Sequence, residues 1–127
     1  MSESPLAPAV FDRLRQATAK DPSVLAELCR EYLTEARGAL AQIHEALRSK
    51  DAGMLRDRAH YVKGSSMMIG ATVLSQYCAA LEKMGRDADF TASEETLQQA
   101  EGASAEVEHE LTRQVGPDVV PAEGSAA

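Results

Sequence analysis

Apolar residues recur along most of the chain at about every third or fourth position, which is the spacing of a helix with one buried face. No stretch alternates apolar and polar residues over a useful length, as a half-buried strand would. The pattern therefore predicts an all-α fold, an antiparallel four-helix bundle with a short additional N-terminal helix. The predicted helices cover residues 8–18, 22–50, 52–69, 73–86 and 92–115.

Residues typical of helix ends stand at the boundaries of these stretches. Asp21-Pro22 has the order of an N-cap followed by proline at the first helical position, and Asp51 is a second candidate N-cap. Gly70 favours the end of a helix because glycine adopts left-handed conformations at little cost. The expected organisation is a flexible segment at 1–7, one helical bundle at 8–116 and a disordered tail at 117–127.

The composition supports one helical domain with an aliphatic core. Of 127 residues, 44% are hydrophobic but only 4% are aromatic, and the chain has no Trp. Cys29 and Cys78 fall on apolar helical faces, where a thiol behaves as a small hydrophobic group. No apolar segment approaches the roughly 20 residues of a membrane span, and the start lacks a signal-peptide pattern. We therefore expect a cytoplasmic monomer with no membrane contact.

The formal net charge is −7, which argues against a nucleic-acid partner because such binding needs clustered Lys and Arg. Positive charge is nevertheless concentrated in one place, at Arg56, Arg58 and Lys63. An acidic protein surface therefore remains a suitable partner for this part of the chain.

His60 stands out because the helical wheel places it away from the core. The apolar face of its helix consists of Leu55, Ala59, Val62, Ser66 and Ile69. On the other side, His60 is surrounded by Arg56, Asp57, Lys63, Gly64 and Met67. A glycine inside a helix costs about 1 kcal/mol relative to alanine, and no internal packing explains one on an outward face. Gly64 therefore indicates that another molecule comes close to His60.

The imidazole has the chemistry of a phosphoryl acceptor. A neutral ring nitrogen is a nucleophile near neutral pH, and Lys63, three residues later, can offset added negative charge. Met67 and Met68 are interpreted as soft apolar contacts for a partner, in preference to plain surface residues. We interpret His44 and His109 as ordinary surface histidines.

Several signatures of enzymes are missing. The sequence contains no glycine-rich phosphate loop, no kinase nucleotide-binding region, no HExxH motif and no CxxC pair. We therefore predict no ATPase or kinase activity, no bound cofactor and no bound metal. A phosphoryl group on His60 must then come from another protein.

The residues around His60 closely resemble the histidine-containing phosphotransfer (HPt) domain, and the helical layout from about 8 to 115 fits as well. The matching positions are Ala59, His60, Lys63, Gly64, Ser65, Ser66, Ile69, Gly70 and Ala71, followed by Leu74, Cys78, Leu81, Glu82 and Arg86.

This resemblance implies that His60 is phosphorylated and that Lys63 assists with the phosphoryl charge. It implies docking of receiver domains beside Gly64, with Arg56, Asp57, Met67 and Met68 as further candidate contacts. The implied partners are response-regulator receivers and the receiver domain of a hybrid histidine kinase. Mg²⁺ would be bound by the receiver, not by this chain.

Two other interpretations fit the sequence less well. A bundle that only binds and regulates a receiver or a kinase would not need the imidazole of His60. The phosphoacceptor region of a histidine kinase usually has an acidic residue after its histidine, whereas this chain has Tyr61.

Overall fold

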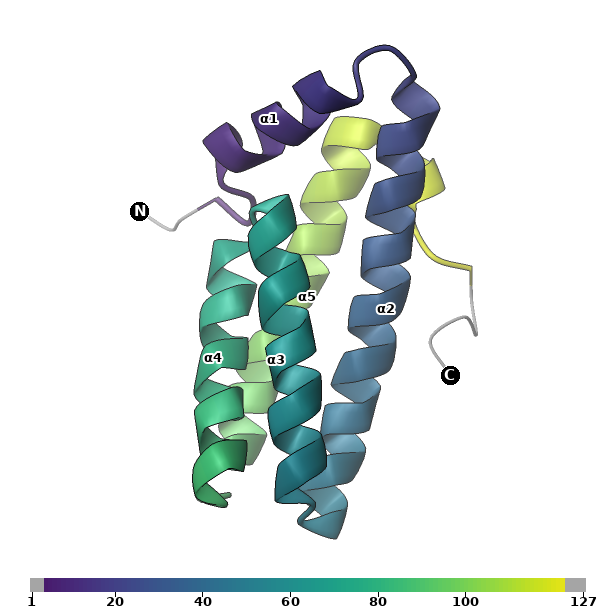
Figure 1. The fold of residues 1–127 in the computed structure, drawn as a ribbon. Helices are drawn as coiled ribbons and strands as arrows, with labels where there is room; N and C mark the ends of the chain where they lie inside the picture. Colours follow the sequence, from purple (N-terminus) through teal and green to yellow (C-terminus); the bar gives the residue numbers. More distant parts are fainter. Residues whose placement is uncertain (1–3, 123–127) are drawn as a thin grey trace.

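Five α-helices and one short 3₁₀-helix form the computed structural model, which describes residues 4–122. The helices are α1 (Pro8–Ala17), α2 (Pro22–Ser49), α3 (Ala52–Ile69), α4 (Thr72–Asp87) and α5 (Ser93–Val115), followed by η1 (Pro117–Val119). Helices α2 to α5 lie side by side as an antiparallel bundle, and α1 crosses one end (Figure 1). Residues 4–122 contain no strand, so the predicted fold is confirmed.

The helix ends follow the predicted local chemistry. The Asp21 side chain accepts the backbone N–H of Ser23 at the start of α2, where Pro22 is the first residue. The Asp51 side chain caps α3 in the same way. Gly70 ends α3 at φ 91°, a left-handed conformation that side chains rarely adopt. This tight end turns the chain directly into α4, so that α3 and α4 pack against each other.

The core is aliphatic, as predicted, and it confirms the orientation expected for α3. The whole apolar face of α3 is buried, and it consists of Leu55, Ala59, Val62, Ser66 and Ile69. Cys29 and Cys78 are both fully buried. Burial raises the pKa of Cys29 to about 11 and that of Cys78 to about 12, so both thiols stay protonated at neutral pH.

The two ends of the chain are more ordered than the composition suggested. Leu6 is 1% exposed, and the N–H of Ala7 donates to the carbonyl of Gly70 at 2.7 Å. The prediction of a flexible segment at 1–7 is therefore wrong for Leu6 and Ala7. Their apolar side chains fill the space where α1 crosses the end of α3.

The prediction of disorder from residue 117 is also wrong, for residues 117–122. Val119 is completely buried against α2 and α5, and Arg30 donates to the backbone carbonyl of Asp118 at 3.2 Å. Pro121 is buried as well. Two apolar side chains thus anchor a segment whose Pro, Gly and acidic content is typical of loose tails. Residues 1–3 and 123–127 lie outside the described part. Within residues 4–122, no helix is long and apolar enough to cross a membrane.

Candidate functional site

His60 lies near the middle of α3, on the side that faces away from the core. Its side chain is 68% exposed, while its neighbours Ala59 and Val62 are completely buried. The long helix holds the imidazole in a fixed position at the surface, where a second molecule can reach it.

Glu82 connects His60 to the neighbouring helix α4. One carboxylate oxygen of Glu82 lies 2.9 Å from Nδ1 of His60, and the other lies 2.6 Å from Nζ of Lys63. Glu82 is mostly covered, with 12% of its side chain exposed. The single carboxylate therefore holds both side chains that were predicted to carry the chemistry.

This contact determines which ring nitrogen of His60 is free to react. The ammonium of Lys63, and to a lesser degree the imidazole of His60, lower the pKa of Glu82, so the carboxylate is ionised at neutral pH. An ionised carboxylate can only accept hydrogen bonds, so Nδ1 of His60 must carry the hydrogen. In the neutral imidazole the lone pair is then on Nε2, which is the nucleophilic atom.

Gly64 leaves open space one turn after His60. A Cβ atom added to Gly64 would meet nothing within 4 Å outside its own helix turn. Gly85 on α4 is different, since a Cβ there would lie 2.5 Å from the backbone nitrogen of Arg56. Packing within the bundle thus explains Gly85 but not Gly64, in agreement with the predicted outward position of Gly64.

The remaining predicted docking residues are all exposed on α3. Arg56 and Asp57 are exposed and form an ion pair with each other at 3.2 Å. Met67 and Met68 are 61% and 81% exposed. Met68 lines a groove together with Tyr61.

The positive charge expected around His60 is largely paired. Lys63 is held by Glu82, Arg56 by Asp57, and the guanidinium of Arg58 stacks over the ring of Tyr61 at 5.5 Å from its centroid. His60 is therefore an exposed imidazole with three cationic side chains nearby, and each of these cations already has a partner within the protein.

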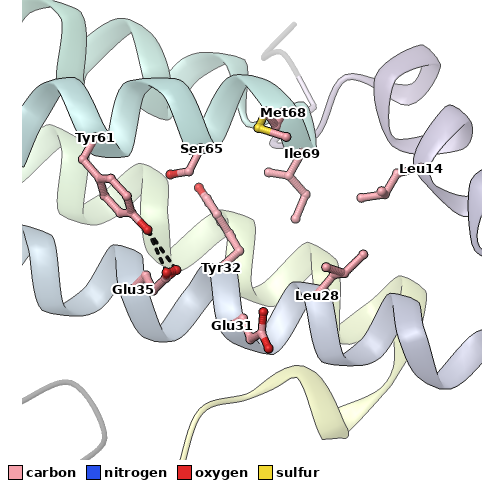
Figure 2. Close-up of a pocket in the computed structure, with 9 residues that line it drawn as sticks. All are labelled: Leu14, Leu28, Glu31, Tyr32, Glu35, Tyr61, Ser65, Met68 and Ile69. Atoms are coloured by element: carbon pink, nitrogen blue, oxygen red, sulfur yellow. Dashed lines mark hydrogen bonds between the residues drawn. The ribbon is translucent and has the colours of Figure 1, made fainter.

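An apolar groove of about 300 Å³ begins at Tyr61, the residue after His60, and runs between α2 and α3 toward α1 (Figure 2). The groove was not predicted, because three separate helices contribute to it. Of its residues, only Met68 was predicted as a docking contact. Its residues are Leu14, Leu28, Glu31, Tyr32, Glu35, Tyr61, Ser65, Met68 and Ile69. At its floor, Tyr32 and the buried Ser66 share a hydrogen bond of 2.7 Å, which satisfies both hydroxyl groups.

The role of Glu82 was also missed, although its position is part of the family resemblance. Helical periodicity shows which face of α4 is apolar, but not which residue of α4 lies opposite His60. The direct connection between α3 and α4 through Gly70 was the only available signal, since it predicts that these helices are neighbours.

Comparison with known protein families identifies the domain. The family model described as Hpt domain matches residues 27–115, which include His60, Lys63 and Glu82. The chain belongs to the Hpt family. Histidine phosphotransfer in a phosphorelay is accordingly the function of this domain.

This Hpt domain is similar to one bacterial protein of known structure and to one yeast protein. The crystal structure of histidine-containing phosphotransfer protein B (HptB) from Pseudomonas aeruginosa PAO1 is similar with a TM-score of 0.82 and 26% sequence identity; the match covers 89% of this chain and 96% of that chain. Multistep phosphorelay regulator 1 of Schizosaccharomyces pombe is 28% identical over 78 residues. That match covers 61% of this chain but only 26% of the yeast protein, so the chain spans about a quarter of its length.

Proposed function

We propose that His60 is the phosphoacceptor, and that the protein passes phosphoryl groups between its Nε2 atom and aspartates of receiver domains. One of these receivers would belong to a hybrid histidine kinase and others to response regulators. The observation that carries this proposal is the placement of an exposed imidazole whose Nδ1 atom is held by the carboxylate of Glu82. That contact leaves Nε2 as the reactive nitrogen.

In the transfer step, the lone pair of Nε2 attacks the phosphorus of the receiver's aspartyl phosphate. A P–N bond forms, the P–O bond to the aspartate breaks, and the electron pair leaves with the aspartate carboxylate. No proton has to leave the ring, because Nδ1 keeps its hydrogen. The positive charge that develops on the ring is offset by Glu82, which already accepts that hydrogen. Transfer to the next receiver is the same step in reverse.

Lys63 is placed to share its charge between Glu82 and the incoming phosphoryl group. Its Nζ atom is 2.6 Å from Glu82, and the side chain is 30% exposed. As a residue at i+3 it lies one turn from His60 on the same side of the helix. We propose that the ammonium stabilises the phosphoryl oxygens while Glu82 keeps it near the ring.

A receiver has to cover the surface around His60, because the reacting atoms must come within about 3–3.5 Å of each other. We propose that it lies against Gly64 and contacts Arg56 and Asp57. Further along α3 it would contact Met67 and Met68, and it would use the apolar groove that Tyr61 and Met68 line. Residues 4–122 hold no cluster of three or more metal-binding side chains, and we propose that the Mg²⁺ needed for transfer is bound by the receiver.

The decisive experiment is transfer from a panel of phosphorylated receiver domains in the presence of Mg²⁺. The wild type should gain an acid-labile phosphoryl group, and His60→Gln should gain none while keeping its helical circular dichroism. His44→Gln and His109→Gln are matched controls at two other exposed histidines, and both should be labelled normally. Incubation with ATP alone should give no label and no hydrolysis. Label that persists in His60→Gln, or binding of receivers without any transfer to the wild type, would contradict the proposal.

A further inference from the structure

Tyr61 is an exposed aromatic residue that is held in place from two sides. The residue is 38% exposed, yet its hydroxyl donates to the carboxylate of Glu35 on α2, at 2.7 and 2.9 Å from the two oxygens. The guanidinium of Arg58 lies over the ring at 5.5 Å from its centroid, within cation–π range. A single conformation is thus favoured before any partner arrives.

Because Tyr61 lies beside His60, its fixed conformation affects how a partner docks there. Tyr61 directly follows the phosphoacceptor and forms the end of the apolar groove nearest to it (Figure 2). On its other side is a smaller hollow of about 200 Å³, also bounded by Glu35 and Arg58. Tyr61 and Glu35 therefore line both hollows, and the ring stands between them.

We propose that Tyr61, fixed by Glu35 and Arg58, determines which receiver domains this protein accepts. The inference rests on the proposed function, since it concerns the partner that docks beside His60. The groove ends at Tyr61, so it admits an apolar side chain of limited length from the receiver. The carboxylates of Glu31 and Glu35 at its edge favour a Lys or Arg beside that side chain.

The energetics support a role for this residue above its neighbours. Tyrosine is common among residues that dominate binding energy, because a large ring with few rotatable bonds loses little conformational freedom in a complex. In this protein the contacts with Glu35 and Arg58 already restrict the conformational freedom of Tyr61 before a partner binds. A receiver that matches the ring then binds at low cost, and one that requires the ring to move has to break a charge-assisted hydrogen bond.

The test compares Tyr61→Ala, Tyr61→Phe and Glu35→Gln with the wild type, in transfer from two receivers that the wild type accepts with different efficiency. Initial rates over a range of receiver concentrations separate KM from the rate at saturation. Tyr77→Phe, on α4, and Glu27→Gln, on the exposed side of α2, are the matched controls. Phosphorylation of His60 by the small donor phosphoramidate measures the imidazole without any docking.

For the preferred receiver, Tyr61→Ala should raise KM by about 10-fold or more, the effect of losing a dominant contact. Tyr61→Phe and Glu35→Gln should raise it by smaller factors, and the preference between the two receivers should narrow in all three variants. The rate at saturation, the reaction with phosphoramidate and both controls should be unchanged. Glu35→Gln should also lower the alkaline pKa of Tyr61, which the hydrogen bond to Glu35 raises.

An unchanged KM and an unchanged receiver preference in the three variants would overturn this inference while leaving the proposed function intact. A lower rate with phosphoramidate would overturn it as well, because Tyr61 would then act on the imidazole. Should Tyr61→Ala unfold, the two conservative variants decide the question. Failure of the wild type to accept phosphate from any receiver would instead refute the proposed function.

Discussion

The carboxylate of Glu82 binds His60 across two helices, with Oε2 of Glu82 2.9 Å from Nδ1 of the imidazole. The other oxygen of the same group binds Lys63 at 2.6 Å. One residue on α4 therefore fixes the tautomer of His60 on α3 and the position of the neighbouring Lys63. The reactivity of this site depends on how α3 and α4 pack as much as on the sequence around His60.

Glu82→Ala should slow the phosphorylation of His60. A hydrogen bond to a charged group contributes about 1.5–3 kcal/mol, which corresponds to a loss of about 10-fold or more in rate if it stabilises the transition state. Glu82→Gln should have a smaller effect, since its amide oxygen can still accept from Nδ1. Phosphoramidate labelling gives the rates, and ¹⁵N shifts of the imidazole give the tautomer. A dominant Nε2–H tautomer in the wild type would contradict the assigned role.

The contribution of Glu82 to stability should depend on pH in the acid range. Its pKa in the folded protein is below the ordinary value of 4.5, so its contribution is complete above about pH 4.5 and is lost as the pH falls through the folded-state pKa. Glu82→Gln should lower the free energy of unfolding on the order of 1 kcal/mol at pH 7. Urea unfolding at several pH values should show this difference shrinking below pH 4.5. A difference that is constant with pH would argue against the ion pair.

Lys63→Ala should affect the phosphoryl group more than the fold. Its ion pair is partly exposed, so the loss of stability should stay under about 1 kcal/mol, while transfer slows or the lifetime of the phosphohistidine changes. Lys83→Ala is the matched control, because Lys83 forms an ion pair with Asp87 at 2.7 Å on the neighbouring helix. Both variants should melt similarly. Equal transfer rates and phosphohistidine lifetimes in the two would show that the ammonium of Lys63 has no special role.

The fold and the orientation of His60 could be predicted because helical periodicity is a local property. The face of α3 from Leu55 to Ile69 is buried as its apolar pattern requires. The partner of His60 could not be predicted in this way, since Glu82 is 22 residues away and meets it only through the packing of α4 on α3. The apolar groove was not predicted for the same reason, since residues of α1, α2 and α3 meet there only in the folded protein.

The errors at the chain ends have a different cause. The composition of the first seven residues and of the tail suggested disorder, yet Leu6 is buried in the first segment, and Val119 and Pro121 are buried in the second. Average composition does not reveal that one side chain fills a gap at the end of a bundle.

Gly85→Ala should destabilise the bundle. An added Cβ would lie 2.5 Å from the backbone nitrogen and 2.8 Å from Cα of Arg56, and backbone atoms in a helix cannot move away cheaply. Overpacking of this kind typically costs about 1–3 kcal/mol, which exceeds the gain in helix propensity of about 1 kcal/mol. Thermal melting gives the result. A variant that melts above the wild type would show that α3 and α4 can separate here without cost.

Gly64 should behave in the opposite way, because its added side chain meets nothing within the protein. Gly64→Ala should raise stability by up to about 1 kcal/mol, through better helix propensity and a more restricted unfolded chain. Gly64→Gln should also fold well, but its side chain would hold the receiver away from His60. A displacement of 1 Å can cost about 100-fold in rate, so transfer from the receiver should nearly stop.

Gly102 provides the control for this last prediction. It also lies inside a helix, α5, with nothing within 4 Å of an added Cβ, and it belongs to a helix that does not carry His60. Gly102→Gln should therefore match Gly64→Gln in thermal melting but transfer at the wild-type rate. Phosphoramidate should label His60 in both variants, which separates docking from reactivity. Equal transfer rates in the two glutamine variants would mean that no receiver surface approaches α3 at Gly64, and that docking relies on the groove alone.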